Sequence, residues 1–144
     1  MEYPALFESD PKGGILVTFP DFGFATHGDS EIDAYGMARD LLIHILSDRI
    51  VDKQDIPRPG KVRNKRGRMR LVALSALTAA KIALYEELRA SRISKSELAR
   101  RMGQPKQQVE RLFNLRRASR MDQVELAFAA LGKRLSIKVE DAAA

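Results

Sequence analysis

One stretch of the chain, residues 95–114 (KSELARRMGQPKQQVERLFN), restricts the possible fold more than any other feature. Ala99 is small, as close packing of two steeply crossed helices requires. Gly103 can adopt a positive φ in a tight turn without steric strain. Val109 is a branched apolar residue that can pack a second helix against the first. The other apolar positions of this predicted interface are Leu98, Met102 and Leu112. The order predicts a helix-turn-helix, with an ordinary helical hairpin as the alternative.

The residues that flank these positions agree with two short helices. Ser94 or Ser96 can cap the first helix. Pro105 fits the first turn of the second helix, where its missing N–H is not needed. Gln104 is the weak position, since such turns often hold an apolar residue. The capping signals therefore favour a helix break centred on Gly103.

Polar side chains on the second predicted helix point away from its apolar positions. The start of a recognition helix is the part that meets base edges. Gln pairs bidentately with adenine and Arg with guanine, whereas other cations are suited to phosphate contact or are simply solvated. The candidate DNA-binding residues are Lys95, Ser96, Lys106, Gln107, Gln108, Arg111, Asn114, Arg116 and Arg117. Further candidates for phosphate contact are Arg100, Arg101 and Arg120.

Charge is distributed unevenly along the chain. Residues 1–60 contain 5 Lys or Arg and 11 Asp or Glu, a net charge of −6, whereas residues 61–144 contain 20 and 8, a net charge of +12. A basic half suits a polyanion, although unevenly solvated surface charge gives the same numbers. The asymmetry indicates two surfaces with different partners.

Residues 1–75 are predicted to form a small α+β domain. β-branched and aromatic residues separated by turn signals predict strands at residues 3–8, 15–19, 24–27 and 69–74. A helix over residues 30–50 begins at Ser30, with Asp33 as its capping-box acid. Its predicted apolar stripe consists of Ile32, Tyr35, Ala38, Leu42, Ile45 and Leu46. One helix of this kind covers one face of a small sheet.

Residues 76–144 are predicted to form a second, mainly helical domain. The pattern is helical from Thr78, where residues with high helix propensity follow. A last helix is predicted over residues 121–131, and it ends before Gly132, a residue typical of the C′ position. Alternating apolar residues over 135–139 predict a short terminal strand. Such an edge invites pairing with a second copy of the chain, and packing on its own domain is the alternative. A dimer is also expected because one helix-turn-helix reads few base pairs.

Both halves resemble the HicB antitoxin family. SELARRMGQPKQQVERLFNLRRAS is similar to the Cro/repressor-type helix-turn-helix of longer HicB members. The first half has the hairpin with a Gly-Gly turn, the Phe-Pro-Asp corner, the Gly-Asp-Ser helix start and then an Ala-rich helix. The Pro-x-Pro pair Pro57 and Pro59 also has a counterpart there. The resemblance covers nearly the whole chain.

The resemblance implies a specific division of labour. The N-terminal domain would be a partly degraded ribonuclease-H-like fold that binds a small HicA-like, mRNA-cleaving toxin. The C-terminal domain would bind the operator of its own operon and form a homodimer or higher oligomer. The acidic residues 1–60 would meet a basic, RNA-seeking toxin, which favours fast association. The alternatives are a plain dimeric repressor with a ligand-sensing or oligomerising N-terminal domain, and an RNA-processing enzyme.

Catalytic residues are not indicated by the pattern. Cleavage of phosphodiesters by metal ions requires several carboxylates that converge on Mg²⁺. The candidates by residue type alone are Glu8, Asp10, Asp21, Asp29 and Asp40, and their spacing does not bring three together. His27 and His44 lack neighbouring cysteines or paired acids. We therefore expect no enzyme activity, no metal and no cofactor.

A second cationic stretch, residues 58–70, contains no acid. Contact with nucleic acid is one interpretation of it. A solvated connection between helix and strand is the favoured one, because a loop tolerates charge freely.

Several negative features indicate a cytoplasmic protein. The chain has no cysteine, no apolar run of about 18 residues, and an N-terminus (MEYPALFESD) without the basic region of a secretion signal.

Overall fold

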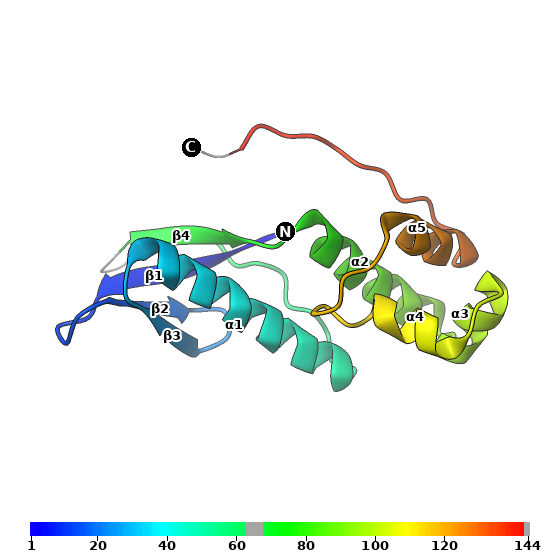
Figure 1. The fold of residues 1–144 in the computed structure, drawn as a ribbon, viewed down its shortest axis with the longest axis horizontal. Helices are drawn as coiled ribbons and strands as arrows, with labels where there is room; N and C mark the ends of the chain where they lie inside the picture. The colour runs from blue at the N-terminus through cyan, green and yellow to red at the C-terminus, as the bar shows by residue number, and fades with distance from the viewer. Residues whose placement is uncertain (63–67, 143–144) are drawn as a thin grey trace. The chain divides into compact units, whose positions relative to one another are not determined.

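The computed structural model describes residues 1–62 and 68–142 of the chain (Figure 1). Three strands, a long helix and a fourth strand are followed by four helices. The chain divides into two compact units, Met1–Ala79 and Ala80–Ala144. The predicted α+β class is confirmed. None of the helices in the described ranges is long and apolar enough to cross a membrane.

The first unit contains a four-stranded antiparallel sheet in the order β3-β2-β1-β4. Its strands are β1 (Glu2–Ser9), β2 (Ile15–Phe19), β3 (Phe24–Gly28) and β4 (Arg68–Ala73). All four predicted strands are present. In the central pair, Phe7 lies opposite Val17, and Tyr3 lies opposite Val72 on the other side of β1. Because opposite residues share a face, these four buried side chains form one apolar surface.

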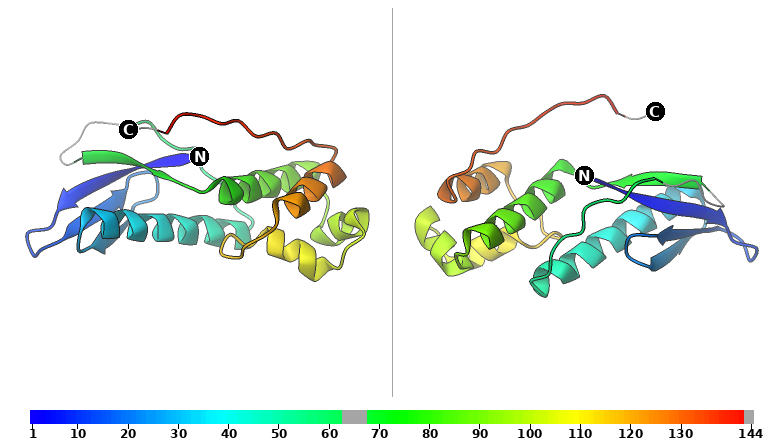
Figure 2. Two further views of the ribbon diagram at one scale, coloured as in Figure 1. Left: turned by 45° about the horizontal axis from the view of Figure 1, so that its top comes forward. Right: turned by 180° about the vertical axis from the view of Figure 1, so that it is seen from behind.

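The long helix α1 (Glu31–Val51) lies along this side of the sheet (Figure 2). It begins as predicted, since the Ser30 hydroxyl accepts a hydrogen bond from the Asp33 N–H at 3.1 Å. The buried residues are Ala34, Ala38, Leu42, Ile45, Leu46 and Ile50. Ile32 was wrongly placed in the stripe: it is 88% exposed, because the 3.6-residue period points it away once Ala34 and Ala38 face the sheet.

The second unit contains the larger part of α2 (Ala76–Ser91), with α3 (Lys95–Met102), α4 (Lys106–Leu112) and α5 (Met121–Ala130) (Figure 1). α3 packs against both α4 and α5. The core of the unit is built from Ile82, Leu84, Leu98, Val109, Val124 and Phe128, each at most 5% exposed. After α5, Gly132 adopts the predicted left-handed conformation, with φ 72°.

The predicted terminal strand does not form within the described part of this single chain. Residues 133–142 have no regular secondary structure, and Ile137 and Val139 are 75% and 92% exposed. A strand requires a neighbour for its N–H and C=O groups, and no strand among the described residues pairs with this segment. Alternation of apolar and polar side chains is therefore not sufficient to form a strand.

Candidate nucleic-acid interface

Helix α3 is delimited by the residues that the sequence indicates. The Ser94 hydroxyl, rather than that of Ser96, accepts a hydrogen bond from the Glu97 N–H at 3.0 Å and caps the helix. The helix ends at Gly103, whose φ of 64° is left-handed. A side chain at this position would be strained. Gly103 therefore allows the sharp change of direction between α3 and α4.

Helix α4 follows directly after this turn. Pro105 is its N-cap rather than a residue of the first turn, with an extended ψ of 145°. Val109 and Leu112 are 0% and 2% exposed, as predicted, and α4 packs against α3. Burial of this side of α4 leaves its opposite side to solvent.

Eight of the nine candidate DNA-binding residues have exposed side chains. On α4 these are Lys106, Gln107, Gln108 and Arg111, and elsewhere they are Ser96, Asn114, Arg116 and Arg117. Lys95 is half-buried, with its Nζ atom 5.2 Å from the centre of the Phe113 ring. The structure thus places amide and cationic groups on α4 and on the loop that follows it.

Asn114 has a structural contact of its own. Its side-chain oxygen accepts a hydrogen bond from the Arg116 N–H at 3.0 Å. Such a contact stabilises a turn. The Asn114 side chain therefore helps to shape the loop that carries Arg116 and Arg117.

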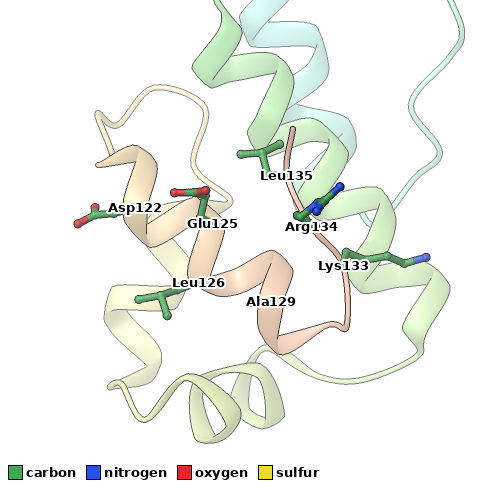
Figure 3. A pocket seen from close by; sticks show the side chains of 7 residues that line it. All are labelled: Asp122, Glu125, Leu126, Ala129, Lys133, Arg134 and Leu135. Carbon is green, nitrogen blue, oxygen red and sulfur yellow. The ribbon is translucent and has the colours of Figure 1, made fainter. Parts of the chain in front are cut away.

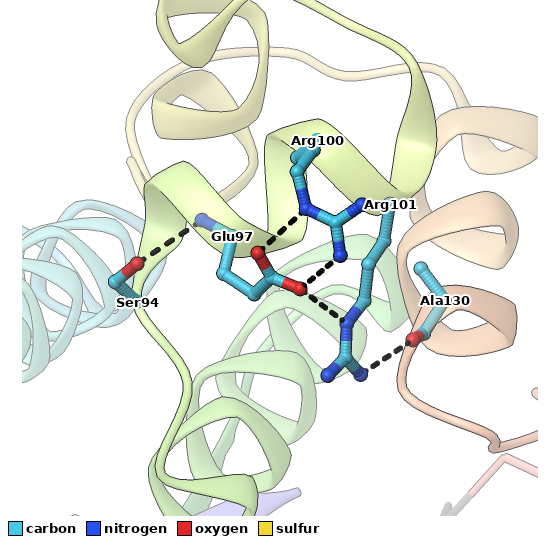
Figure 4. Close-up of polar contacts among 5 residues, drawn as sticks. All are labelled: Ser94, Glu97, Arg100, Arg101 and Ala130. Atoms are coloured by element: carbon cyan, nitrogen blue, oxygen red, sulfur yellow. Dashed lines mark hydrogen bonds and ion pairs between the residues drawn. The ribbon is translucent and has the colours of Figure 1, made fainter.

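Three of the candidates for phosphate contact form ion pairs within the chain. Glu97 accepts hydrogen bonds from Arg100 Nε at 2.8 Å and from Arg101 Nε at 3.1 Å (Figure 4). Arg101 also donates to the Ala130 carbonyl at 3.4 Å and so links α3 to α5. Hydrogen bonds from Arg100 and Arg101 lower the pKa of Glu97 to about 2. Arg120 pairs with Asp122 at 2.7 Å.

Lys81 on α2 is absent from the sequence-predicted set. Its side chain is only 1% exposed, and it donates hydrogen bonds to backbone carbonyls of the α4 end and the following loop. The sequence does contain a signal for this buried lysine. Lys81 lies at helical spacing from Leu84, Tyr85 and Leu88, which are all buried, so it belongs to the apolar stripe of α2. A charge in such a stripe requires internal partners.

An open depression of about 320 Å³ lies beside α5 (Figure 3). Its lining residues are Asp122, Glu125, Leu126, Ala129, Lys133, Arg134 and Leu135. None of the candidate DNA-binding residues contributes to it. The depression and the exposed side of α4 are therefore separate surfaces.

The candidate catalytic residues are not gathered into a metal centre. Within residues 1–62 and 68–142, no three His, Asp or Glu side chains lie close enough together to hold a metal ion. His27 Nε2 lies 3.6 Å from an Asp10 carboxylate oxygen and 2.9 Å from the Gly13 carbonyl oxygen. His44 lies 3.5 Å from Asp48. Each histidine thus lies near a carboxylate: His44 and Asp48 are spaced i,i+4 on α1, whereas His27 and Asp10 are distant in sequence.

The cationic stretch 58–70 is only partly described. Arg63, Lys65 and Arg66 lie outside the described residues. Arg68 and Arg70 both pair with Glu31 in the first turn of α1. These two arginines therefore connect β4 to the helix.

Comparison with known proteins identifies the family that this chain resembles. The family model for the HicB-like antitoxin of bacterial toxin–antitoxin systems matches residues 2–83. The chain is 39% identical over 138 residues to Antitoxin HicB of Escherichia coli K12, which covers 95% of this chain and 98% of that protein. It is 35% identical over 141 residues to Antitoxin HicB 1 of Photorhabdus laumondii, with 97% and 88% covered. For Antitoxin HicB of Pseudomonas fluorescens the identity is 36% over 115 residues, with 80% and 77% covered.

The chain is thus an antitoxin of a bacterial toxin–antitoxin system, not an enzyme. It belongs to the HicB-like antitoxin family, and the resemblance seen in the sequence is confirmed. The family model ends within α2, whereas the similarity to the Escherichia coli and Photorhabdus proteins covers nearly the whole chain. An antitoxin implies a toxin partner.

Proposed function

We propose that this antitoxin acts in the cytoplasm on two partners through two domains, residues 1–75 and 76–144. The first domain binds and neutralises a HicA-like, mRNA-cleaving toxin. The second is a helix-turn-helix domain that binds operator DNA and represses the antitoxin's own operon. The proposal needs no cofactor, metal or catalytic residue.

The charge and topology of the first domain support its role. Residues 1–60 carry a net charge of −6, which complements a basic, RNA-seeking toxin and favours fast association. The order β3-β2-β1-β4, with one helix covering the sheet, supports a reduced ribonuclease-H-like fold. Two of the carboxylates that a nuclease would require accept backbone hydrogen bonds instead: Asp21 from the Gly60 N–H and Asp10 from the Lys12 N–H, both at 2.9 Å.

The observation that carries DNA binding is the two-sided character of α4. Val109 and Leu112 are buried while Gln107 and Arg111 are exposed. The latter two are able to form bidentate hydrogen bonds with adenine and guanine in the major groove. We assign to the same surface the other candidate residues: Lys95, Ser96, Lys106, Gln108, Asn114, Arg116 and Arg117.

We also infer that two copies bind the operator together. Ile137 and Val139 are exposed at alternate positions of the segment after α5, so the segment has the pattern of a strand without its neighbour. A second copy supplies such a neighbour by antiparallel pairing. Ile137→Lys should then lower the dimer fraction in sedimentation equilibrium, and an unchanged fraction would exclude this contact.

The test uses the whole chain in two assays. Binding to a duplex from the chain's own promoter is measured by fluorescence anisotropy against a scrambled duplex, and toxin neutralisation by growth of cells that express the toxin. Gln107→Ala/Arg111→Ala should lose operator preference and keep neutralisation. Arg39→Ala, which removes one exposed charge on α1, is the control for DNA binding and should keep the operator preference. Loss of neutralisation in the double variant, with the fold intact, contradicts the division of labour.

A further inference from the structure

Lys81 joins α2 to the end of the proposed recognition helix. Its Nζ atom donates hydrogen bonds to the carbonyl oxygens of Arg111 at 3.2 Å, Asn114 at 2.9 Å and Arg117 at 2.5 Å. An ammonium has three donors, and here each finds a backbone acceptor. The acceptors span the last turn of α4 and the loop behind it.

Physical chemistry explains why a lysine occupies a buried position here. The last carbonyls of a helix lack partners within the helix, and a cation is favoured at this negative end of the helix dipole. Burial lowers the pKa of the Lys81 ammonium, whereas carbonyl acceptors favour its charged form. A buried charge is tolerated only when it is paired in this way.

The three residues whose carbonyl oxygens accept these hydrogen bonds are exposed to solvent. Arg111, Asn114 and Arg117 are exposed while their carbonyl oxygens are drawn toward Lys81. Phe113 and Leu115, between them, are buried at 4% and 7% exposure. Leu112 is also buried, at 2%. The Lys81 ammonium, these three apolar side chains and the Asn114–Arg116 hydrogen bond together hold the backbone from Arg111 to Arg117.

We propose that Lys81 is a positioning residue for DNA recognition: it fixes the path of residues 111–117 and so orients Arg111 and Arg117 toward DNA. This inference rests on the proposed function of α4. Lys81 is itself too deeply buried to contact DNA, so its effect on binding is indirect. The Arg111 and Asn114 carbonyls also accept hydrogen bonds from the backbone N–H groups of Asn114 and Arg117, both at 3.2 Å. Removal of the ammonium therefore keeps these turns but removes the donor that joins the three carbonyls to α2.

The absence of cysteine from the chain permits a chemical test. Lys81→Cys is alkylated under denaturing conditions with bromoethylamine, which restores a lysine-like ammonium, or with iodopropane, which yields an uncharged side chain of the same length. Both products are refolded as full-length protein. The two forms then differ only in the terminal ammonium.

The propyl form should lose about tenfold or more of the operator-to-scrambled affinity ratio, roughly the share of one bidentate base contact. The aminoethyl form should recover the ratio of the unmodified protein. The amide NMR signals of residues 111–117 should broaden or shift only in the propyl form. An operator preference that is equal in both forms overturns the positioning role.

Leu84→Ala is the control that distinguishes an effect on loop position from a general loss of stability. Leu84 is a fully buried residue of the same helix, and its truncation destabilises the core without removing a donor to the loop. At a temperature where all variants are folded, Leu84→Ala should keep the operator preference. Equal loss in Leu84→Ala and in the propyl form reduces Lys81 to a structural residue and contradicts the proposal.

Two further outcomes are distinguishable. If the propyl form does not refold, Lys81→Met takes its place: it keeps an unbranched side chain of similar length and has no donor, so its ratio should fall, whereas an unchanged ratio refutes positioning. If the unmodified protein itself shows no preference for the operator, the proposed DNA-binding function fails, and the Lys81 inference fails with it.

Discussion

The hydroxyl of Tyr3 donates a hydrogen bond to the carbonyl oxygen of Pro57 at 2.7 Å, across 54 positions of the chain. The Tyr3 ring lies 5.4 Å from the ring of Phe22, centre to centre. Next to Phe22, Asp21 accepts a hydrogen bond from the Gly60 N–H. The Phe-Pro-Asp corner and the Pro-x-Pro segment are therefore two halves of one arrangement that holds the chain after α1 against the sheet.

Tyr3→Phe should destabilise the first unit by about 1 kcal/mol, because the Pro57 carbonyl loses its donor while the ring remains. Tyr3→Leu also removes the ring contact with Phe22 and should cost more, about 2–4 kcal/mol. Urea unfolding followed by NMR signals of the first unit measures both values. Equal stability of Tyr3→Phe and the unmodified chain would show that this hydrogen bond has no net effect.

Two glycines of the first unit should respond to alanine in opposite ways. A Cβ atom at Gly28 would lie 2.3 Å from the Ala34 backbone nitrogen, whereas one at Gly36 meets nothing within 4 Å. Gly28→Ala should therefore destabilise the unit by about 1–3 kcal/mol through overpacking. Gly36→Ala, within α1, should stabilise it by about 1 kcal/mol through helix propensity. Urea midpoints that move in the same direction for both variants contradict this packing.

Local signals predicted much of the fold and part of the candidate site. Ser30 and Ser94 cap their helices, and Gly103 turns the chain, because each effect depends on neighbours within four residues. The strands were predictable for the same reason, since alternation and turn residues are local. Buried Val109 and Leu112 then determine which side of α4 is exposed.

Features that depend on distant residues were not predictable in this way. The three carbonyls bound by Lys81 lie 30 to 36 positions away, so no local pattern reveals them. The predicted terminal strand is absent for the converse reason. Ile137 and Val139 alternate with polar residues, as in a strand, but pairing requires a second strand that the described part of the chain does not provide. The pairing of Arg100 and Arg101 with Glu97 is a local exception: spacings of three and four residues on α3 indicate these ion pairs.

The Glu97 ion pairs should make the second unit sensitive to acid. The pKa of Glu97 is lowered from 4.5 to about 2, so the carboxylate contributes stability that is fully present above pH 4.5. That contribution is lost as the pH falls from 4.5 toward 2. Glu97→Gln should be less stable than the unmodified chain at pH 7, and the difference should shrink through this window.

Salt provides the control for this prediction. Exposed ion pairs are screened at high ionic strength, so 1 M NaCl should narrow the difference at pH 7. Thermal melts of both proteins between pH 7 and pH 2.5 give the comparison. A difference that is independent of both pH and salt means that Glu97 acts through packing and not through charge.

Base readout and phosphate contact should be separable on the α4 surface. Gln107 and Arg111 are four residues apart, so they lie on one side of the helix, one turn from each other. Val109 and Leu112 occupy the buried side. Arg116 and Arg117 follow the helix and are also exposed. Under the proposed function, the first pair would contact base edges and the second the DNA backbone.

Gln107→Ala or Arg111→Ala should each cost about 1–3 kcal/mol of operator binding and relax the preference at one base pair per half-site. Arg116→Ala or Arg117→Ala should instead weaken binding to all sequences alike and flatten the salt dependence by about one unit per lost phosphate contact. None of the four side chains is buried, so melting temperatures and toxin inhibition should be retained. Binding to operator and scrambled duplexes at several salt concentrations distinguishes the two classes. If the specific-to-scrambled ratio is unchanged in Gln107→Ala and Arg111→Ala, α4 is not the helix that reads the operator.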